Sequence, residues 1–385
     1  MLVAIRNLMV NILSSFIRDR EARHDFRNKY KRKSNFRKLS DDNKRLFNEN
    51  KILEERMTRL QRNFDRLNNK RMYKITNDRI KSSRKFFEYP NITEKYQNLI
   101  SGLDDESLQC VSQILGRRWL ISQQKLSEDE NEIRWLDIFS EEEIRQLNKI
   151  GKDFRQKIVP LADGCFAYKQ HMLPINQFRL NVFYYKHDLL KLKYLNRIKN
   201  MDVIDAGGCI ADSAIMFTEH FKGRIYTFEP TSENYELMLK TIEINNCKNI
   251  VPVKLALGSK DEVMKIKTFG GASTLNQDMP AYQMTDKIEE VSVTTLDNFL
   301  KGKDLNVGLI KVDVEGFEQE FLKGAYNTIK KYKPAMLISI YHNTSDFFNI
   351  RPIIDSWDLG YSFKISRPVD GDISGETMLI CEQDS

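Results

Sequence analysis

From residue 200 onward, short apolar runs alternate with stretches whose apolar residues have helical spacing. The runs predict buried strands and the stretches between them predict helices. The predicted strands are 203–206, 224–228, 250–256, 307–312, 335–340, 361–365 and 378–381. The predicted helices are 213–220, 232–245, 317–330 and 345–357. This alternation indicates an α/β fold with a seven-stranded, doubly wound, mostly parallel sheet whose last strand is antiparallel.

Upstream of the sheet, residues 96–122 and 140–154 have the pattern of amphipathic helices. Ser140 is the expected N-cap of the second helix, because Glu143 follows three residues later as in a capping box. Residues 181–192 are expected to form a strand or a short ordered segment. We therefore expect a helical lead-in region over residues 79–172, covering one edge of the sheet, and a main domain over residues 173–385.

A leucine recurs every seven residues from Leu39 to Leu67. This heptad pattern predicts a coiled coil over residues 36–78 with leucine at position d. Asn43 and Asn50 fall at position a, where each can hydrogen-bond its partner only in a parallel, aligned assembly. We expect this coil to hold a homo-oligomer, with a lone solvated helix as the alternative.

Residues 1–35 have the pattern of an amphipathic helix that continues into a run of Arg and Lys. Through residues 1–33, such a helix can lie on an anionic membrane surface. Its apolar face can equally pack on the protein's own body or on a partner subunit, and the sequence leaves both open. No recognised nucleic-acid-binding motif accompanies the basic run, so no nucleic-acid partner is expected.

Composition narrows the class of protein further. The formal net charge of the 385 residues is +7, and Lys and Arg crowd residues 18–85. We find no apolar run of about 18 residues, which a membrane-spanning helix needs, and no secretory cleavage site. The five cysteines show no CxxC or Cys/His metal spacing, so no metal site is expected. We expect a cytoplasmic protein with reduced thiols.

The first strand of the main domain runs into a glycine turn. Asp205 ends this strand, Gly207 and Gly208 permit close approach of a ligand, and a helix begins near Asp212. Ligands of such sheets bind beyond the carboxyl ends of the strands. Glu229 ends the second strand, where a carboxylate can accept both hydroxyls of a ribose. These residues indicate a ligand that contains adenosine.

The same turn discriminates among such ligands. It lacks the G-x-G-x-x-G of a dinucleotide site, and no G-K-[ST] follows as in a P-loop. Asp205 would repel a pyrophosphate but can pair with a cationic amino group, which favours S-adenosylmethionine. The alternative is a turn that merely packs helix on strand. Ala211 stands where a third glycine is expected; its methyl group is tolerable in a helical backbone and costly at positive φ.

Polar residues also follow the fourth and fifth strands. Asp313 and Glu315 lie two apart, so an extended backbone would point both to one side. An acceptor hydroxyl needs its proton removed or held as its oxygen attacks a sulfonium methyl in line. His342 is another candidate base, because the ordinary pKa of histidine lies near working pH. A structural role for His342 and helix capping by the carboxylates are the alternatives.

Six segments in chain order resemble the FkbM family of S-adenosylmethionine-dependent methyltransferases, a branch of the Rossmann-like class I fold. They are VIDAGGCIADSA, YTFEPTSENYELM, VPVKLALGS, VTTLDNFL, IKVDVEGFEQEFLKGA and ISIYH, and the resemblance extends from about residue 173 to residue 381. The cofactor-binding residues expected from the turn and the resemblance are Asp205, Gly207, Gly208, Asp212, Glu229, Ala256 and Leu257. Those expected at the transfer site are Asp313, Glu315 and His342.

The resemblance implies O-methylation, with acceptors that include sugars of bacterial surface polysaccharides. The basic N-terminus also resembles those of bacterial capsule and lipopolysaccharide biosynthesis enzymes. We therefore expect a methyltransferase acting on a sugar hydroxyl of a surface polysaccharide, or of its lipid-linked precursor, at the inner face of the membrane. A same-fold methyltransferase of a small metabolite or lipid, and a non-catalytic coiled-coil scaffold with a degenerate domain, are the alternatives. Residues 269–275 are expected to form a flexible loop over the acceptor or an ordinary hairpin turn.

Overall fold

The computed structural model describes residues 73–130, 132–269, 272–274 and 288–383. The expected basic helix over residues 1–35 and the heptad repeat up to residue 72 lie outside the described residues. The last residues of the expected coiled coil are described: β1 covers Tyr73–Ile75 and α4 begins at Asn77. Across the described ranges, no helix has both the length and the apolar character needed to cross a membrane.

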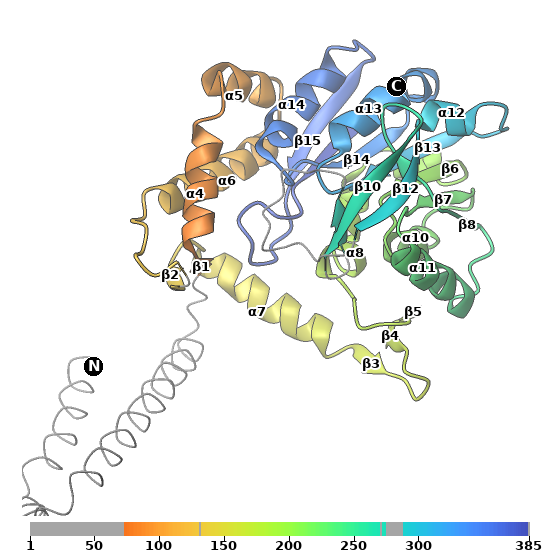
Figure 1. Cartoon of the computed structure of the whole chain (residues 1–385), viewed down its shortest axis with the longest axis horizontal. Helices are drawn as coiled ribbons and strands as arrows, with labels where there is room; N and C mark the ends of the chain where they lie inside the picture. Colours follow the sequence, from red (N-terminus) through yellow and green to blue (C-terminus); the bar gives the residue numbers. More distant parts are fainter. Residues whose placement is uncertain (1–72, 131, 270–271, 275–287, 384–385) are drawn as a thin grey trace, which may run out of the picture. The chain divides into compact units, whose positions relative to one another are not determined.

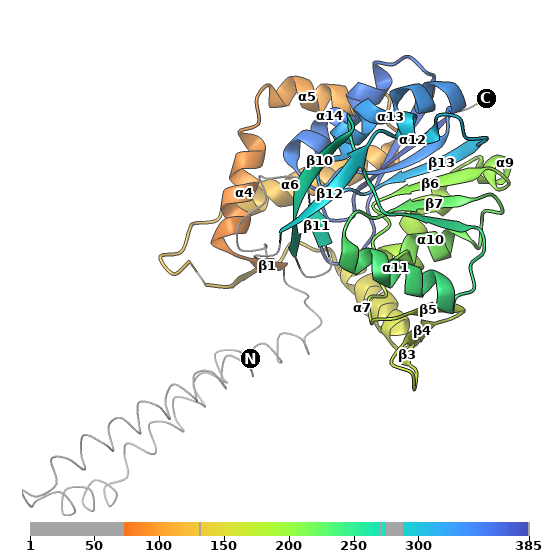
Figure 2. The same cartoon turned by 45° about the vertical axis from the view of Figure 1, so that its right-hand side comes forward.

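A seven-stranded sheet forms the centre of the domain (Figure 1). Its strands are β6 (Asp202–Ala206), β7 (Ile225–Phe228), β8 (Ile250–Val253), β13 (Val307–Val312), β14 (Ala335–Ser339), β15 (Tyr361–Ser366) and β16 (Met378–Gln383). Their order is β15-β16-β14-β13-β6-β7-β8, and β16 runs antiparallel to both of its neighbours. The predicted α/β fold, seven strands and antiparallel last strand are confirmed. Figure 2 shows β13, β6 and β7 side by side, and the chain order reverses between β6 and β13, where ligands of such sheets bind.

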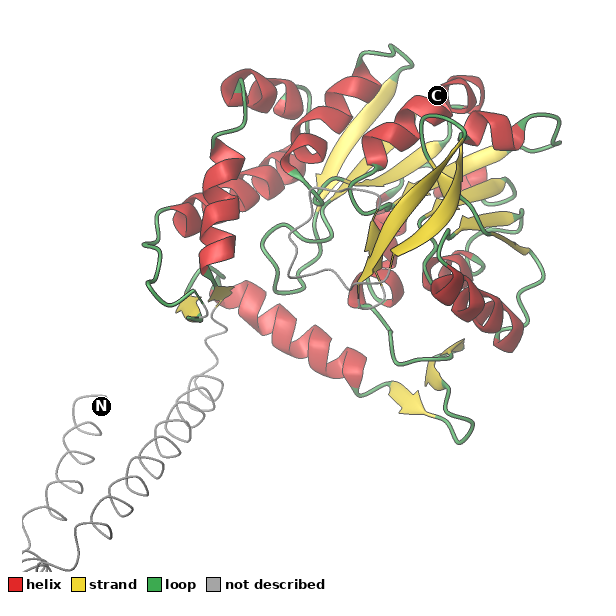
Figure 3. Ribbon diagram, in the orientation of Figure 1, coloured by secondary structure: helices red, strands yellow, loops and turns green. Residues whose placement is uncertain are grey.

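Both faces of the sheet are covered by helices (Figure 3). Successive strand residues point to opposite faces, so Ile204 and Ile310 join one apolar cluster while Val203 and Leu309 join the other. The helices that follow strands are α10 (Asp212–Phe217), α11 (Ser232–Ile244), α12 (Leu296–Leu300), α13 (Glu318–Tyr332) and α14 (Thr344–Asp355). Burial on both faces explains why the strands are continuous apolar runs rather than alternating ones.

The expected strand over residues 250–256 is wrong in its second half. β8 ends at Val253, and a tight turn follows in which the Leu255 N–H donates to the Val253 carbonyl. The chain then enters a second, four-stranded sheet of order β11-β10-β12-β9. Its strands are β9 (Ala256–Leu257), β10 (Glu262–Phe269), β11 (Ala272–Thr274) and β12 (Ile288–Thr294). β10 and β11 pair antiparallel with Phe269 opposite Ala272, whereas residues 270–271 and 275 of the expected loop or hairpin turn lie outside the described residues.

Between residue 73 and the sheet, the described chain forms the longer helices α4 (Asn77–Phe87), α5 (Ile92–Ile100), α6 (Asp105–Ser122) and α7 (Glu141–Arg155). The single helix expected over residues 96–122 is divided, because Gly102 has a φ of +71° and Asp104 caps a new helix. The capping box of Ser140 and Glu143 is confirmed. α6 reaches the edge strand of the sheet, where the Ile365 N–H donates to Ser107 Oγ at 2.9 Å.

Short elements complete the described chain. They are β2 (Arg134–Leu136), β3 (Ile158–Pro160), β4 (Phe166–Tyr168), β5 (His171–Leu173), α8 (Leu180–Phe183), the 3₁₀ helix η1 (Lys186–Lys191) and α9 (Leu195–Ile198). Of the two alternatives expected for residues 181–192, the structure has the short ordered segment and not the strand: it contains the end of α8 and all of η1, and its apolar residues join the apolar cluster on one face of the main sheet.

Candidate functional site

The turn between β6 and α10 passes very close to neighbouring strand ends. A Cβ added to Gly207, whose φ is +79°, would lie 1.8 Å from the Asp313 carbonyl oxygen. A Cβ added to Gly208 would lie 1.8 Å from Thr227 Oγ1. Both glycines are therefore required where β6, β7 and β13 converge.

Asp205 stabilises this turn through interactions inside the protein. It has no exposed surface, its Oδ1 lies 3.2 Å from Lys311 Nζ, and its Oδ2 accepts hydrogen bonds from Ser213 Oγ and Thr227 Oγ1 at 2.8 and 2.9 Å. Burial lowers the pKa of Lys311, but Asp205 and other carboxylates raise it more, so the ion pair is retained. The expected contact of Asp205 with the amino group of a ligand is not available, because its carboxylate is fully buried and does not line the cavity.

Ala211 adopts the more costly of the two expected conformations. Its φ is +65°, in the left-handed region, and it is the N-cap of α10. Its methyl group is fully buried in an apolar cluster and does not line the cavity beside the turn. The substitution of alanine for glycine therefore strains the turn locally without obstructing the cavity.

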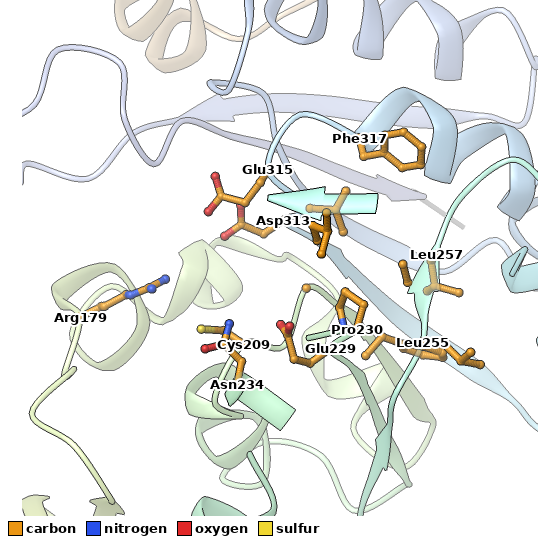
Figure 4. Close-up of a pocket in the computed structure, with 15 residues that line it drawn as sticks. Arg179, Cys209, Glu229, Pro230, Asn234, Leu255, Leu257, Asp313, Glu315 and Phe317 are labelled. Carbon is orange, nitrogen blue, oxygen red and sulfur yellow. The ribbon is translucent and has the colours of Figure 1, made fainter. Parts of the chain in front are cut away.

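The cavity lies beyond the carboxyl ends of the central strands and contains about 670 Å³ of space, part of it open to solvent. Figure 4 shows Asp313 and Glu315 on one side, Glu229 and Cys209 on the opposite side, and Arg179 pointing in from a third. The cofactor-binding residues that line it as expected are Gly207, Glu229, Ala256 and Leu257. Asp205, Gly208 and Asp212 do not line it.

Glu229 is almost completely buried and faces the cavity. Its Oε1 accepts hydrogen bonds from the Thr231 N–H at 2.9 Å and from Thr231 Oγ1 at 2.5 Å. Burial raises the pKa of Glu229 to about 7, and these hydrogen bonds oppose that rise. The carboxylate is thus fixed by its own loop at the end of β7, where a ribose is expected.

Asp313 and Glu315 both line the cavity, although not for the expected reason. The backbone is not extended: Glu315 has a φ of +54° and Gly316 a φ of +93°. Burial raises the pKa of Asp313, but Lys311 and His342 lower it more, so Asp313 is held as a carboxylate. The pKa of Glu315 is raised by burial, which makes Glu315 the better proton acceptor of the two.

His342 was a candidate base, with a structural role as the alternative, and its surroundings do not leave its pKa at the ordinary value. Its Nδ1 lies 2.9 Å from Glu318 Oε1, and its Nε2 lies 3.4 Å from both Asp313 Oδ1 and Glu315 Oε2. Burial lowers the pKa of His342, but the three carboxylates raise it to about 10. The ring is therefore a cation and lies behind the cavity wall rather than in it.

Arg179 and Glu318 were not anticipated from the sequence. Arg179 precedes α8 and lines the cavity, and within the described ranges its guanidinium makes neither a hydrogen bond nor an ion pair. Asp212 contributes most to raising the pKa of Arg179. No local pattern marks an arginine upstream of the first strand; only the packing of α8 against α10 brings it to the site. Glu318 follows the EG dipeptide in the quoted segment and could have been noticed as a third carboxylate there.

Comparison with known proteins agrees with this arrangement. Residues 205–363 match the family model described as the methyltransferase FkbM domain. Methyltransferase 1 of Beauveria bassiana (strain ARSEF 2860) is 26% identical over 191 residues, which are 43% of this chain and 74% of that protein.

Two solved structures are similar in part. Methyltransferase FkbM from Methylobacillus flagellatus KT has a TM-score of 0.47 and 17% identity, over 75% of this chain and 58% of that one. The chain thus spans less than two thirds of that structure's length. A putative methyltransferase from Streptococcus mutans in complex with SAH has a TM-score of 0.31 and 12% identity, over 51% of this chain and 93% of that one. Residues 205–363, which include β7, β8, β13, β14 and most of the cavity-lining residues, thus match the methyltransferase FkbM domain.

Proposed function

We propose that the protein is an S-adenosylmethionine-dependent O-methyltransferase. The observation that carries this proposal is the cavity at the ends of β6, β7 and β13, which has Glu229 on one side and Asp313 with Glu315 on the other. It lies in a segment that matches a methyltransferase domain. One side of the cavity suits a nucleoside, and the other suits a group that gives up a proton.

The cavity residues fit the cofactor. The Glu229 carboxylate can accept both ribose hydroxyls, and Ala256 and Leu257 provide apolar surface for adenine. The guanidinium of Arg179, which makes no hydrogen bond or ion pair with the described residues, can hold the carboxylate of the methionine part in a bidentate pair. Gly207 lines the cavity, and the absence of a side chain there lets the turn lie against the Asp313 carbonyl at the edge of the cofactor space.

When bound, S-adenosylmethionine supplies a sulfonium methyl group, which an acceptor oxygen takes as the C–S pair stays on sulfur and the hydroxyl proton departs. Glu315 receives that proton at its carboxylate in our proposal, because burial raises its pKa. Asp313 stays ionised beside Lys311 and His342 and keeps the region anionic.

For the acceptor we propose a sugar hydroxyl of a bacterial surface polysaccharide or its lipid-linked precursor, on the strength of the sequence resemblance. Cytoplasmic location, membrane contact through residues 1–33 and a homo-oligomer held by the heptad repeat belong to the same proposal. A small metabolite or lipid acceptor is the second candidate. The open cavity and its ionisable side chains favour an enzyme over a non-catalytic scaffold.

Isothermal titration calorimetry of the full chain with S-adenosylhomocysteine tests the proposal. We expect micromolar binding that Glu229→Ala weakens by about 10- to 100-fold, because charge-assisted hydrogen bonds are lost. Glu236→Ala is the matched control, since Glu236 is an exposed glutamate of α11 outside the cavity. Absence of binding by the unmodified protein would overturn the proposal, and unchanged affinity in Glu229→Ala would remove Glu229 from the site.

A further inference from the structure

The ring of His342 lies among carboxylates that come from three places in the chain. Asp313 and Glu315 follow β13, Glu318 begins α13, and His342 follows β14. Because β13 and β14 are parallel neighbours, their carboxyl ends meet. Ligand atoms of Asp313, Glu318 and His342 lie within 4.8 Å of one another, and Glu315 Oε2 lies 3.4 Å from His342 Nε2.

The distances around His342 Nε2 are long for hydrogen bonds. The side chain is only 6% exposed, and neither ring nitrogen makes a well-aligned hydrogen bond in the described part of the chain, although Nδ1 lies 2.9 Å from Glu318 Oε1. Charge-assisted N–H···O bonds are about 2.7–2.9 Å long, but both carboxylate oxygens lie at 3.4 Å. Two ligand atoms bonded to one tetrahedral metal at about 2.0–2.1 Å are separated by about 3.4 Å. The spacing therefore suits a metal cation that takes the place of the proton on His342 Nε2, because an imidazole nitrogen must lose its proton to bind a metal.

The other ring nitrogen of His342, Nδ1, lies beside a carboxylate, as is usual for the second nitrogen of a metal-binding histidine. Glu318 has no exposed surface, and its Oε1 accepts the Val314 N–H at 2.9 Å while lying 2.9 Å from His342 Nδ1. A buried carboxylate on one ring nitrogen orients the other toward a metal. The left-handed backbone of Glu315 turns its carboxylate toward the same nitrogen, and such strain is typical of functional sites.

We propose that a divalent metal cation binds between His342 Nε2, Asp313 and Glu315, with Glu318 positioning the imidazole ring. Asp313 and Glu315 also line the cavity, so the remaining coordination positions face the space for the acceptor. One imidazole with carboxylates suits Mn²⁺, Fe²⁺ or Zn²⁺. The sequence did not predict this site because the spacing criterion looks for cysteine and histidine pairs, whereas these ligands are brought together by neighbouring strands.

The role of the cation rests on the proposed function. A cation here would bind the acceptor oxygen and lower the pKa of its hydroxyl, and the carboxylate oxygen of Glu315 that does not bind the cation would take the proton, as in the proposed function. The binding site itself does not depend on methyl transfer and can be tested alone.

Calorimetric titration of the full chain with Mn²⁺, after removal of metals with EDTA and without cofactor, tests the site. We expect one Mn²⁺ per chain, with affinity lowered by about 100-fold or more in Asp313→Asn and His342→Gln, and by about 10- to 100-fold in Glu318→Gln. His220→Gln is the matched control, because His220 lies beside the carboxylate of Glu219 and outside the cavity. Its affinity for Mn²⁺ is expected to equal that of the unmodified protein.

Near-ultraviolet circular dichroism shows whether His342→Gln folds correctly. If it does not, the Mn²⁺ affinity of Asp313→Asn alone tests the site. The proposal is overturned if the unmodified protein binds no Mn²⁺ at millimolar concentration, or if Asp313→Asn binds it equally well. Binding of S-adenosylhomocysteine to the EDTA-treated protein keeps the two proposals apart. Cofactor binding without Mn²⁺ binding overturns only the cation site, whereas Mn²⁺ binding without cofactor binding supports this site and overturns the proposed function.

Discussion

The two sides of the cavity were predicted from the same kind of pattern, polar residues after buried strands, but they differ in what those residues do. On the cofactor side, the buried carboxylate of Asp205 pairs with Lys311 and accepts hydrogen bonds from two hydroxyls. Glu229 is the carboxylate on this side that faces the cavity. On the acceptor side, Asp313 and Glu315 both face the cavity. The ring of His342, which does not line the cavity, lies 3.4 Å from both carboxylates. A strand-end carboxylate is therefore a candidate ligand only after its own protein partners have been counted.

The largest effect we predict concerns the interior of the cofactor side. Lys311→Met leaves Asp205 as a buried charge without its cation and should lower the free energy of unfolding by about 3–5 kcal/mol. Lys323→Met is the control, since it removes an exposed ion pair with Glu320 that contributes at most about 1 kcal/mol. Urea denaturation followed by circular dichroism measures both. Equal losses in the two variants would mean that Asp205 does not depend on Lys311.

A smaller effect is expected at the third wall of the cavity. Arg179→Ala should weaken binding of S-adenosylhomocysteine by about 10- to 100-fold, because a charge-assisted bidentate contact is lost. Arg179→Lys should retain only part of the affinity for S-adenosylhomocysteine, since an ammonium group cannot form the two parallel hydrogen bonds of a planar guanidinium. Arg197→Ala, which removes a guanidinium stacked on Tyr194, is the control for calorimetry. Full affinity in Arg179→Ala would assign this arginine to another ligand.

The pKa of Glu229 makes cofactor binding dependent on pH. Burial raises this pKa from 4.5 to about 7, so the carboxyl is mostly protonated at pH 6 and ionised at pH 8. If ribose binds the ionised form, affinity should rise about tenfold over this interval. In the ligand-free protein the raised pKa stabilises the fold below pH 4.5, and this contribution is lost as pH rises through 7.

Glu229→Gln should flatten the pH profile of affinity between pH 6 and 8, as measured by calorimetry at constant ionic strength. A profile that stays equally steep in this variant would place the responsible group elsewhere, with Glu315 on the acceptor side as the next candidate because its pKa is also raised.

The smallest effect is predicted for Ala211→Gly. Relief of the left-handed strain, about 1–2 kcal/mol, is offset by the lost buried methyl group and the greater entropy of the unfolded chain. Stability should therefore change by less than about 1 kcal/mol, with cofactor affinity unchanged, because residue 211 does not line the cavity. Thermal unfolding and calorimetry check both values. A tenfold gain in affinity would show that the alanine impairs the turn.

Sequence alone determined the order and class of the elements and several of their ends. Apolar runs predicted β6, β7, β13 and β14 because both faces of these strands are buried. The capping box at Ser140 was predictable because all of its atoms lie within one turn of helix. The two glycines and Glu229 were found for the same reason, since a turn or a strand end has a local signature.

Only the tertiary structure decided which of these groups face the cavity and what charge they carry. Asp205 meets Lys311, and Arg179 reaches the cavity, through packing between segments about 100 and 30 residues apart in the chain. His342 becomes a cation because its buried ring is surrounded by carboxylates that follow β13 and begin α13. No local sequence pattern predicts the electrostatic potential that these carboxylates produce. Protonation and accessibility depend on every charge and atom nearby, so they are properties of the folded chain rather than of a motif.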